Sequence, residues 1–171
     1  IMGVEIIGDK VYFNAKIKVG KEEKTFITDG NGKNTTKEYN RYYLPLIDVN
    51  GKLFSIAREK YMANGVEINK EFVINDVDEK VGGEFDGVEE RIMIGEKKYF
   101  SVKKGDVFFL MDHKGDILNI PFNKGFAQGP WIYEIEGNIY ITGKKEGDDK
   151  YTTYDKDGEP IAKKIGYDTA N

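Results

Sequence analysis

The chain contains no cysteine, one histidine, one tryptophan and 4 prolines among its 171 residues. The absence of cysteine excludes disulfides, thiolate metal ligands and cysteine nucleophiles together. It does not identify a compartment, because proteins without cysteine occur on both sides of membranes. A single histidine, His113, cannot build a zinc site from several histidines, and its place in a predicted turn indicates a solvated surface residue. We therefore expect no metal and no cofactor.

The chain also lacks long runs of one kind of residue. No apolar stretch approaches the roughly 20 residues that span a bilayer, so we expect no membrane insertion. No basic stripe occurs and the net charge is −4, which argues against nucleic acid as a partner. No charged-then-apolar leader precedes the opening Ile-Met-Gly, so we expect a trimmed or mature fragment. Its compartment is unknown, with an extracellular or cell-surface location slightly favoured.

What the chain does contain points to β-structure. Glycine, with 20 residues, far outnumbers proline, aromatic residues make up 13% and alanine is scarce. Aromatic residues favour strands, whereas alanine is the strongest helix former. The length suits a single domain, 1–171, with a substantial core.

The clearest local pattern lies in the middle of the chain, where short apolar runs alternate with turns. Tyr99–Val102 and Val107–Met111 are rich in aromatic and β-branched or large apolar residues, as strands are. Asp112-His113-Lys114-Gly115 follows, in which Asp accepts backbone N–H bonds and Gly permits a positive φ, as a hairpin turn requires. With Arg91–Ile94 before and Ile117–Ile120 after, the pattern predicts a four-stranded antiparallel unit.

This unit recurs along the chain at intervals of about 40 to 46 residues. Aligned on an aromatic residue of the second strand, the copies place Phe13, Phe54, Phe100 and Tyr140 in register. Three copies keep Asp-x-x-Gly in the turn after the third strand, and the second copy lacks its Gly. The fourth strands (34–39, 80–85, 117–120 and 161–165) are weaker, as at a sheet edge. The predicted repeats span 1–40, 41–87, 88–123 and 128–168.

The repeat resembles the blade of a β-propeller, a four-stranded antiparallel sheet of about 40–45 residues with apolar inner strands. The resemblance covers nearly the whole chain and is to the class, since no WD dipeptide, kelch double glycine or complete Asp-box assigns a propeller family. It implies an all-β, propeller-like fold whose four blades close alone or belong to a larger ring. A β-sandwich or open barrel made from the same strands is the alternative.

The second copy carries extra residues, Arg58–Lys70, between its second and third strands. The stretch from Ser55 to Ala63, followed by Gly65, fits one or two helical turns with a serine cap and a glycine stop. A loop elaboration is the alternative.

The connections between the predicted repeats hold the best binding candidates. Tyr, Trp and Arg dominate binding surfaces, and Trp can stack on the face of a sugar. The predicted binding residues are Arg41, Tyr42, Glu89, Arg91, Gln128 and Trp131. The alternative is that the aromatic residues in these connections wedge between neighbouring blades without meeting a ligand.

Signals for catalysis are weak by comparison. Glu134 and Glu136 would share one face of a strand, which is typical of a solvated face, and the Asp-Gly turns lack the full set of oxygens of a calcium loop. We therefore expect a non-catalytic binding or interaction module for a glycan or a protein, held by the loops between repeats, with an unknown oligomeric state. The alternatives are a propeller-type carbohydrate hydrolase or lyase, and an architectural segment of a larger surface protein.

Overall fold

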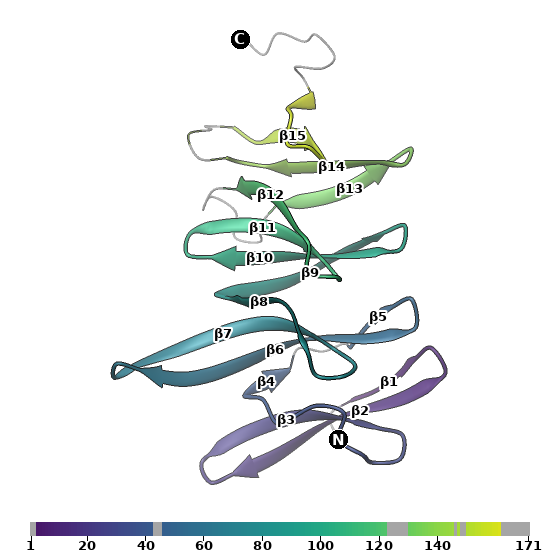
Figure 1. The fold of residues 1–171 in the computed structure, drawn as a ribbon, viewed down its shortest axis with the longest axis vertical. Coiled ribbons are helices and arrows are strands. Elements are labelled where there is room, and N and C mark those ends of the chain that lie inside the picture. Colours follow the sequence, from purple (N-terminus) through teal and green to yellow (C-terminus); the bar gives the residue numbers. More distant parts are fainter. Residues whose placement is uncertain (1–2, 43–45, 123–129, 146, 148–149, 162–171) are drawn as a thin grey trace. The chain divides into compact units, whose positions relative to one another are not determined.

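The computed structural model describes the chain except for residues 1–2, 43–45, 123–129, 146, 148–149 and 162–171 (Figure 1). The described residues form fifteen strands in four sheets and no α-helix, which confirms the all-β class. The strands are β1 (Gly3–Ile7), β2 (Lys10–Val19), β3 (Glu22–Asp29), β4 (Arg41–Tyr42), β5 (Ile47–Val49), β6 (Lys52–Ala63), β7 (Val66–Asn75), β8 (Lys80–Phe85), β9 (Gly87–Ile94), β10 (Lys97–Lys104), β11 (Val107–Asp112), β12 (Ile117–Phe122), β13 (Trp131–Ile135), β14 (Asn138–Gly143) and β15 (Thr152–Asp155).

The chain forms two compact units, Ile1–Val88 and Glu89–Asn171. The first unit holds a three-stranded sheet in the order β1-β2-β3 and a five-stranded sheet in the order β4-β6-β7-β8, with β5 also paired to β6. The second unit holds the sheets β12-β11-β10-β9 and β13-β14-β15. The boundary between the two units lies one residue from the predicted boundary between the second and third repeats. The single domain stays a prediction.

The first three predicted strands are present in all four repeats, but the fourth strand is not. Residues 80–85 form β8 and residues 117–120 lie in β12, whereas residues 34–39 make only isolated bridges between Asn34 and Thr28 and between Tyr39 and Thr25. Most of the predicted strand 161–165 lies outside the described residues. The sheets therefore have three, five, four and three described strands. Closure of these sheets into a propeller ring stays a prediction.

The hairpin turn after the third strand has the same register in every repeat. The Asp or Asn that opens it lies opposite an aromatic residue, in the pairs Tyr12–Asp29, Phe54–Asn75, Tyr99–Asp112 and Tyr140–Asp155. The predicted alignment is therefore wrong by one residue in two repeats, because Tyr12 and Tyr99, rather than Phe13 and Phe100, match Phe54 and Tyr140. In those repeats two aromatic residues are adjacent, and only the cross-strand partner distinguishes them.

The side chain that opens each turn also holds it closed. In the third repeat Asp112 Oδ1 accepts bonds from two backbone N–H groups, at 2.9 and 3.1 Å. In the second repeat Asn75 Oδ1 accepts the same two bonds, at 3.2 and 2.9 Å. Asp78 stands in this turn where the other repeats have Gly, and it adopts the left-handed conformation with φ 63°. An acidic residue thus takes the place that the sequence pattern reserves for glycine.

The Asp112 carboxylate makes the stability of the protein depend on pH. Burial raises its pKa, but the Lys97 ammonium group at 3.1 Å and the two turn N–H groups outweigh burial, so the pKa of Asp112 is lowered. A carboxyl group whose pKa is depressed by folding stabilises the fold above its unfolded-state pKa, and this contribution is lost as the pH falls through the folded-state value.

We expect the free energy of unfolding to fall when the pH drops below about 4. Asp112→Asn should flatten this dependence and reduce stability at neutral pH by about 1 kcal/mol, because asparagine keeps the turn bonds, as Asn75 does, but loses the ion pair. Urea unfolding of both proteins between about pH 3 and 7 measures the difference. An equally steep pH dependence in the variant would contradict the assignment to Asp112.

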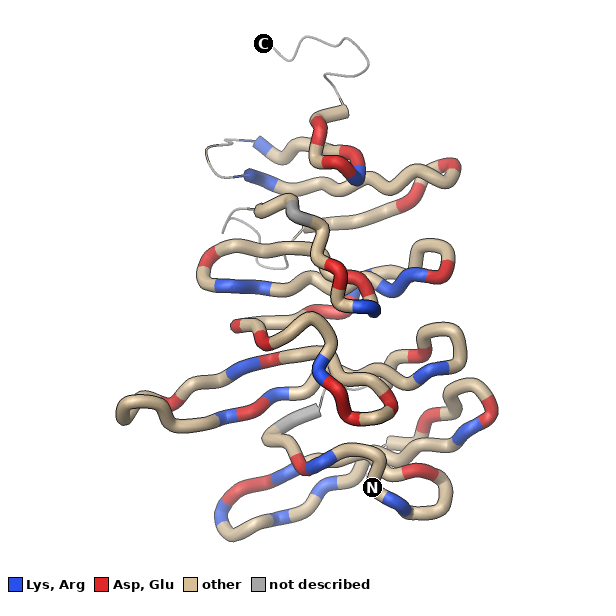
Figure 2. Tube along the Cα trace, in the orientation of Figure 1, with Lys and Arg blue, Asp and Glu red and all other residues tan. Residues whose placement is uncertain are grey.

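The extra residues of the second repeat extend two strands. β6 continues to Ala63 and pairs with Val66 of β7 across a two-residue turn. Asn64 and Gly65 have φ values of 52° and 77°, the positive values that a type I′ turn requires. The prediction of helical turns over 55–63 is therefore wrong. The Asn64-Gly65 pair is the sequence signal for the hairpin turn that forms instead. Figure 2 shows charges of both signs along this long hairpin.

Each sheet has two faces that are distinguished by the register of the turn. We call the face that carries Tyr12, Phe54, Tyr99 or Tyr140 the front face, and the other the back face. In the first unit the front face of β1–β3 and the back face of β6 and β7 form one buried cluster, made of Ile7, Tyr12, Ile27, Tyr39, Leu46, Leu53, Ala57, Phe72 and Ile74. Full burial of one such aliphatic or aromatic side chain contributes roughly 1.5–3 kcal/mol.

The second unit repeats this arrangement. The front face of β9–β12 and the back face of β13–β15 form a cluster of Ile94, Tyr99, Leu110, Ile120, Phe122, Ile132, Ile141 and Tyr154. The rings of Phe122 and Tyr154 meet edge to face, with centroids 6.0 Å apart. In both units, therefore, a front face packs on the back face of the following sheet.

Candidate binding face on β13–β15

The five predicted binding residues that the structure describes lie on three different strands. Arg41 and Tyr42 form β4, whose backbone pairs with Arg58 and Ala57 of β6. Gln128 lies outside the described residues. Glu89, Arg91 and Trp131 belong to the second unit, but β9 and β13 lie in different sheets.

Glu89 and Arg91 form a pair on β9. Arg91 Nη2 donates to Glu89 Oε2 at 2.8 Å, and the Arg91 side chain is 15% exposed. Burial lowers the pKa of Arg91, and the Glu89 carboxylate opposes that change. The Nε atom of Arg91 is buried without a hydrogen-bond partner among the described residues. The pair is a local ion pair, and its role in binding stays a prediction.

Trp131 lies on the exposed front face of β13–β15 together with three tyrosines. Alternation along the strands places Tyr133, Tyr140 and Tyr151 on its side of the sheet. Trp131 and Tyr151 are each 50% exposed, and their ring centroids lie 6.1 Å apart at an angle of 39°. Tyr133 and Tyr140 are direct cross-strand partners with centroids 6.0 Å apart. The aromatic face, as we define it, consists of Trp131, Tyr133, Ile135, Tyr140, Thr142, Tyr151 and Thr153.

Hydroxyl groups lie among these rings. Thr142 and Thr153 pair across β14 and β15, with their Oγ1 atoms 2.9 Å apart. The Tyr133 hydroxyl lies 3.0 Å from Thr142 Oγ1 and donates to Thr153 Oγ1 at 3.4 Å. Lys144 Nζ lies 5.4 Å from the ring centroid of Tyr151. The face therefore combines apolar ring surfaces with alcohol and ammonium groups.

A cavity of about 460 Å³ adjoins the aromatic face and shares Tyr140 with it. The turn between β13 and β14 and the turn after β15 form its walls, through the residues Gly137, Asn138, Ile139, Tyr140, Asp155, Lys156, Asp157 and Ile161. Asp155 Oδ1 accepts two backbone N–H bonds of its turn, at 3.0 and 2.9 Å. Asp157 Oδ1 accepts a bond from Lys156 Nζ at 2.8 Å. The cavity offers an aromatic wall and several hydrogen-bonding groups.

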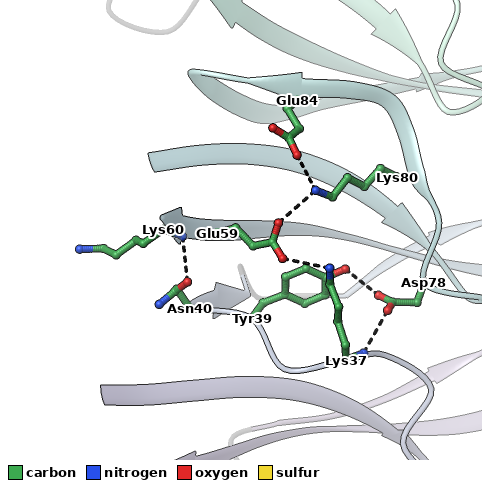
Figure 3. A network of polar contacts seen from close by, with 8 residues as sticks. All are labelled: Lys37, Tyr39, Asn40, Glu59, Lys60, Asp78, Lys80 and Glu84. Atoms are coloured by element: carbon green, nitrogen blue, oxygen red, sulfur yellow. Dashed lines mark hydrogen bonds and ion pairs between the residues drawn. The ribbon is translucent and has the colours of Figure 1, made fainter. Parts of the chain in front are cut away.

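A polar network in the first unit has a structural role (Figure 3). Tyr39 Oη donates to Asp78 Oδ1 at 2.8 Å, and Asp78 Oδ2 accepts the backbone N–H of Lys37 at 3.1 Å. Glu59 of β6 forms ion pairs with Lys37 and Lys80, at 3.0 Å each. These contacts tie the segment that follows the first sheet to β6 and β8.

The pKa shifts in this network agree with a structural role. Burial raises the pKa of Tyr39, and the bond to Asp78 raises it further, so the hydroxyl stays a donor. Burial raises the pKa of Glu59, but the ammonium groups of Lys37 and Lys80 outweigh it and lower the value. These shifts hold each group in its usual protonation state, which suits a clamp and not proton transfer.

The remaining described residues add few signals for chemistry. They contain no group of three or more His, Asp or Glu side chains that could hold a metal ion. The described part of the chain also has no helix of the length and hydrophobicity needed to cross a membrane. His113, predicted to be solvated, is partly buried, and its Nδ1 accepts the backbone N–H of Lys98 at 3.3 Å.

Sequence reasoning identified Trp131 but missed the three tyrosines beside it. The predicted binding residues lie in the connections between repeats, whereas this face is made mainly by strands. The spacing of two between Trp131 and Tyr133 was a signal for one shared strand face. Tyr140 joins that face only once the strand register is known. Comparison of the chain with protein-family models, curated proteins and solved structures found no match.

Proposed function

We propose that the protein is a non-catalytic binding module whose aromatic face binds a glycan, presented on a scaffold of repeated, propeller-like sheets. The observation that carries the proposal is the pair of half-exposed rings of Trp131 and Tyr151, which lie side by side on one sheet face. Sugar rings present flat arrays of C–H groups, and these pack well on exposed aromatic rings.

Polar groups at the edge of the face support the same ligand class. A glycan needs hydrogen-bonding partners for its hydroxyl groups, and a few polar groups at a pocket fix its orientation. The adjoining cavity supplies the amide of Asn138 and the carboxylates of Asp155 and Asp157 beside the Tyr140 ring. Because strands and tight turns hold these groups, little side-chain freedom is lost on binding.

The arrangement favours binding over hydrolysis. Glycoside hydrolysis requires two carboxyl groups that face each other across the scissile bond, one of them a proton donor. In the cavity, Asp155 is engaged by backbone N–H groups and Asp157 by an ammonium group, so both act as acceptors. Glu136 lies in the turn after β13 with φ 51°, so it does not share a strand face with Glu134.

Trp131→Ala should lower the affinity for a bound oligosaccharide at least tenfold, which corresponds to about 1.4 kcal/mol. Tyr151→Ala should lower it about threefold to tenfold, since it removes the smaller ring. A panel of soluble oligosaccharides is screened first by thermal shift, and the hits are measured by isothermal titration calorimetry.

Tyr61→Ala is the matched control, because Tyr61 is 43% exposed but lies on the β6–β7 hairpin. Its affinity should equal that of the unmodified protein. A hit whose affinity is unchanged in Trp131→Ala would place the glycan site elsewhere. A panel without any hit would count against glycan binding as the function.

A further inference from the structure

The back face of β1–β3 is exposed and aliphatic. Val4 and Ile6 of β1 are 53% and 72% exposed, and Val11 of β2 is 36% exposed. The aliphatic face, as we define it, consists of Val4, Ile6, Val11, Phe13, Ala15, Phe26 and Thr28. Apolar side chains gathered on one face of a sheet mark an interaction surface.

The equivalent back faces of other sheets are buried inside each unit. Residues of different repeats are equivalent when they lie the same number of residues from the first hairpin turn of their repeat. By this measure Val4 is equivalent to Leu46 and Ile132, and Val11 is equivalent to Leu53. Leu46 and Leu53 lie in the cluster beneath the front face of β1–β3, and Ile132 lies in the cluster beneath the front face of β9–β12. A back face with this register is therefore built to pack on a front face.

The aromatic face is an exposed front face. Counted in the same way, its residue Ile135 corresponds to Ile7 and Val49. Those two residues are 2% and 1% exposed, whereas Ile135 is 53% exposed. Phe54 on the front face of β6 and Phe100 on the back face of β10 are 6% and 0% exposed. Among the described residues, the aliphatic face and the aromatic face thus differ from their equivalents in being uncovered.

We propose that the protein self-associates head to tail, with the aliphatic face of one molecule packed on the aromatic face of a second molecule. This contact repeats the front-on-back packing that both units already contain. A second copy fits because the aliphatic face offers almost no hydrogen-bonding group, and the hydroxyl groups of Tyr133, Thr142 and Thr153 on the aromatic face already bond to one another. The proposal does not depend on glycan binding, although both would use the aromatic face.

Two properties follow from this geometry. The two contact surfaces differ, so each added molecule leaves one surface of each kind uncovered, and assembly continues beyond a dimer as the concentration rises. A glycan that occupies Trp131 and Tyr151 should compete with assembly. Sedimentation velocity over a roughly hundredfold concentration range should therefore show progressive growth in size, reversed by a bound oligosaccharide.

Two variants test the pairing of the faces. Val4→Glu and Ile135→Glu each place a charge on one contact surface, at positions that are more than half exposed, so both should fold and be monomeric. Mixed in equal amounts, they should form a 1:1 dimer, because the intact aromatic face of the first variant meets the intact aliphatic face of the second. Val66→Glu is the matched control and should still assemble, since Val66 is 63% exposed but lies on the β6–β7 hairpin, outside both faces.

Several results would contradict head-to-tail self-association. A monomeric unmodified protein at all concentrations, or variants that remain monomeric when mixed, would overturn the proposal. An Ile135→Glu variant that still dimerises would indicate symmetric pairing through the aliphatic face alone and would also overturn it. Equal loss of assembly in Val66→Glu and Val4→Glu would show nonspecific adhesion and would also overturn it. Val4→Glu should retain full glycan affinity, so failure of either proposal is recognised independently of the other.

Discussion

Replacing Gly143 with alanine should destabilise the second unit by about 3 kcal/mol or more. Gly143 ends β14 on its back face, and an added Cβ would overlap the ring of Phe122. Phe122 is 1% exposed and packs edge to face on Tyr154, so the ring has little room to move away. Overpacking in a dense core forces strained rotamers or a backbone shift, and here the overlap is with the body of an aromatic ring. Chemical unfolding monitored by circular dichroism measures the loss.

Gly30→Ala is the matched control for this prediction. A Cβ at Gly30 would meet Val11 at 3.6 Å, an ordinary contact distance, and its φ is not positive. Its effect should stay within about 0.5 kcal/mol. Combining Gly143→Ala with Phe122→Leu should recover part of the lost stability, because the smaller side chain relieves the overlap and makes the two effects non-additive. A Gly143→Ala protein as stable as the Gly30→Ala protein would show that the packing of Phe122 is different.

Replacing Glu71 with alanine should destabilise the first unit by about 3 kcal/mol. Glu71 is 7% exposed, and its carboxylate joins two elements. Oε1 accepts bonds from the Arg58 guanidinium, with Nε at 2.9 Å, and Oε2 accepts the backbone N–H of Val88 at 2.9 Å. Removal of a buried partner leaves donors without their acceptor, which is the costly way to break an ion pair.

Two variants on the same hairpin test whether burial and charge account for this loss of stability. Glu71→Gln should lose about half as much stability, because its carbonyl oxygen still accepts one of the bonds while the charge is removed. Glu67→Ala should leave stability essentially unchanged, since the ion pair between Glu67 and Lys60 at 2.9 Å is exposed and screened by solvent. Urea unfolding compares the three proteins. Similar losses in Glu71→Ala and Glu67→Ala would show that burial does not distinguish the two carboxylates.

Strand positions and turns could be predicted from the sequence because they depend on neighbouring residues. The turn at Asp112 is specified by its own side chain and by Gly115, and the same chemistry recurs in each repeat. The helical prediction for residues 55–63 is wrong because Ser55 and Gly65 fit a helix cap and stop equally well. The Asn64-Gly65 turn, together with its flanking alternation, specifies a hairpin.

The register and the exposed faces could not be predicted in this way. Phe13 and Phe100 are as apolar as their neighbours Tyr12 and Tyr99, so only pairing with the third strand decides which face each residue occupies. Trp131 could be proposed as a binding residue from its type alone. Its exposure depends on whether another sheet covers β13–β15, and that is a property of packing between repeats.

The front-on-back contact has the same sense in both units, so each unit keeps one back face and one front face outside its own contact. Because every contact of this kind joins one back face to one front face, a whole repeat can be duplicated or deleted without creating a new kind of surface. Such a protein can change length in evolution by single repeats. Selection on the faces outside these contacts can then proceed separately from selection on the buried ones.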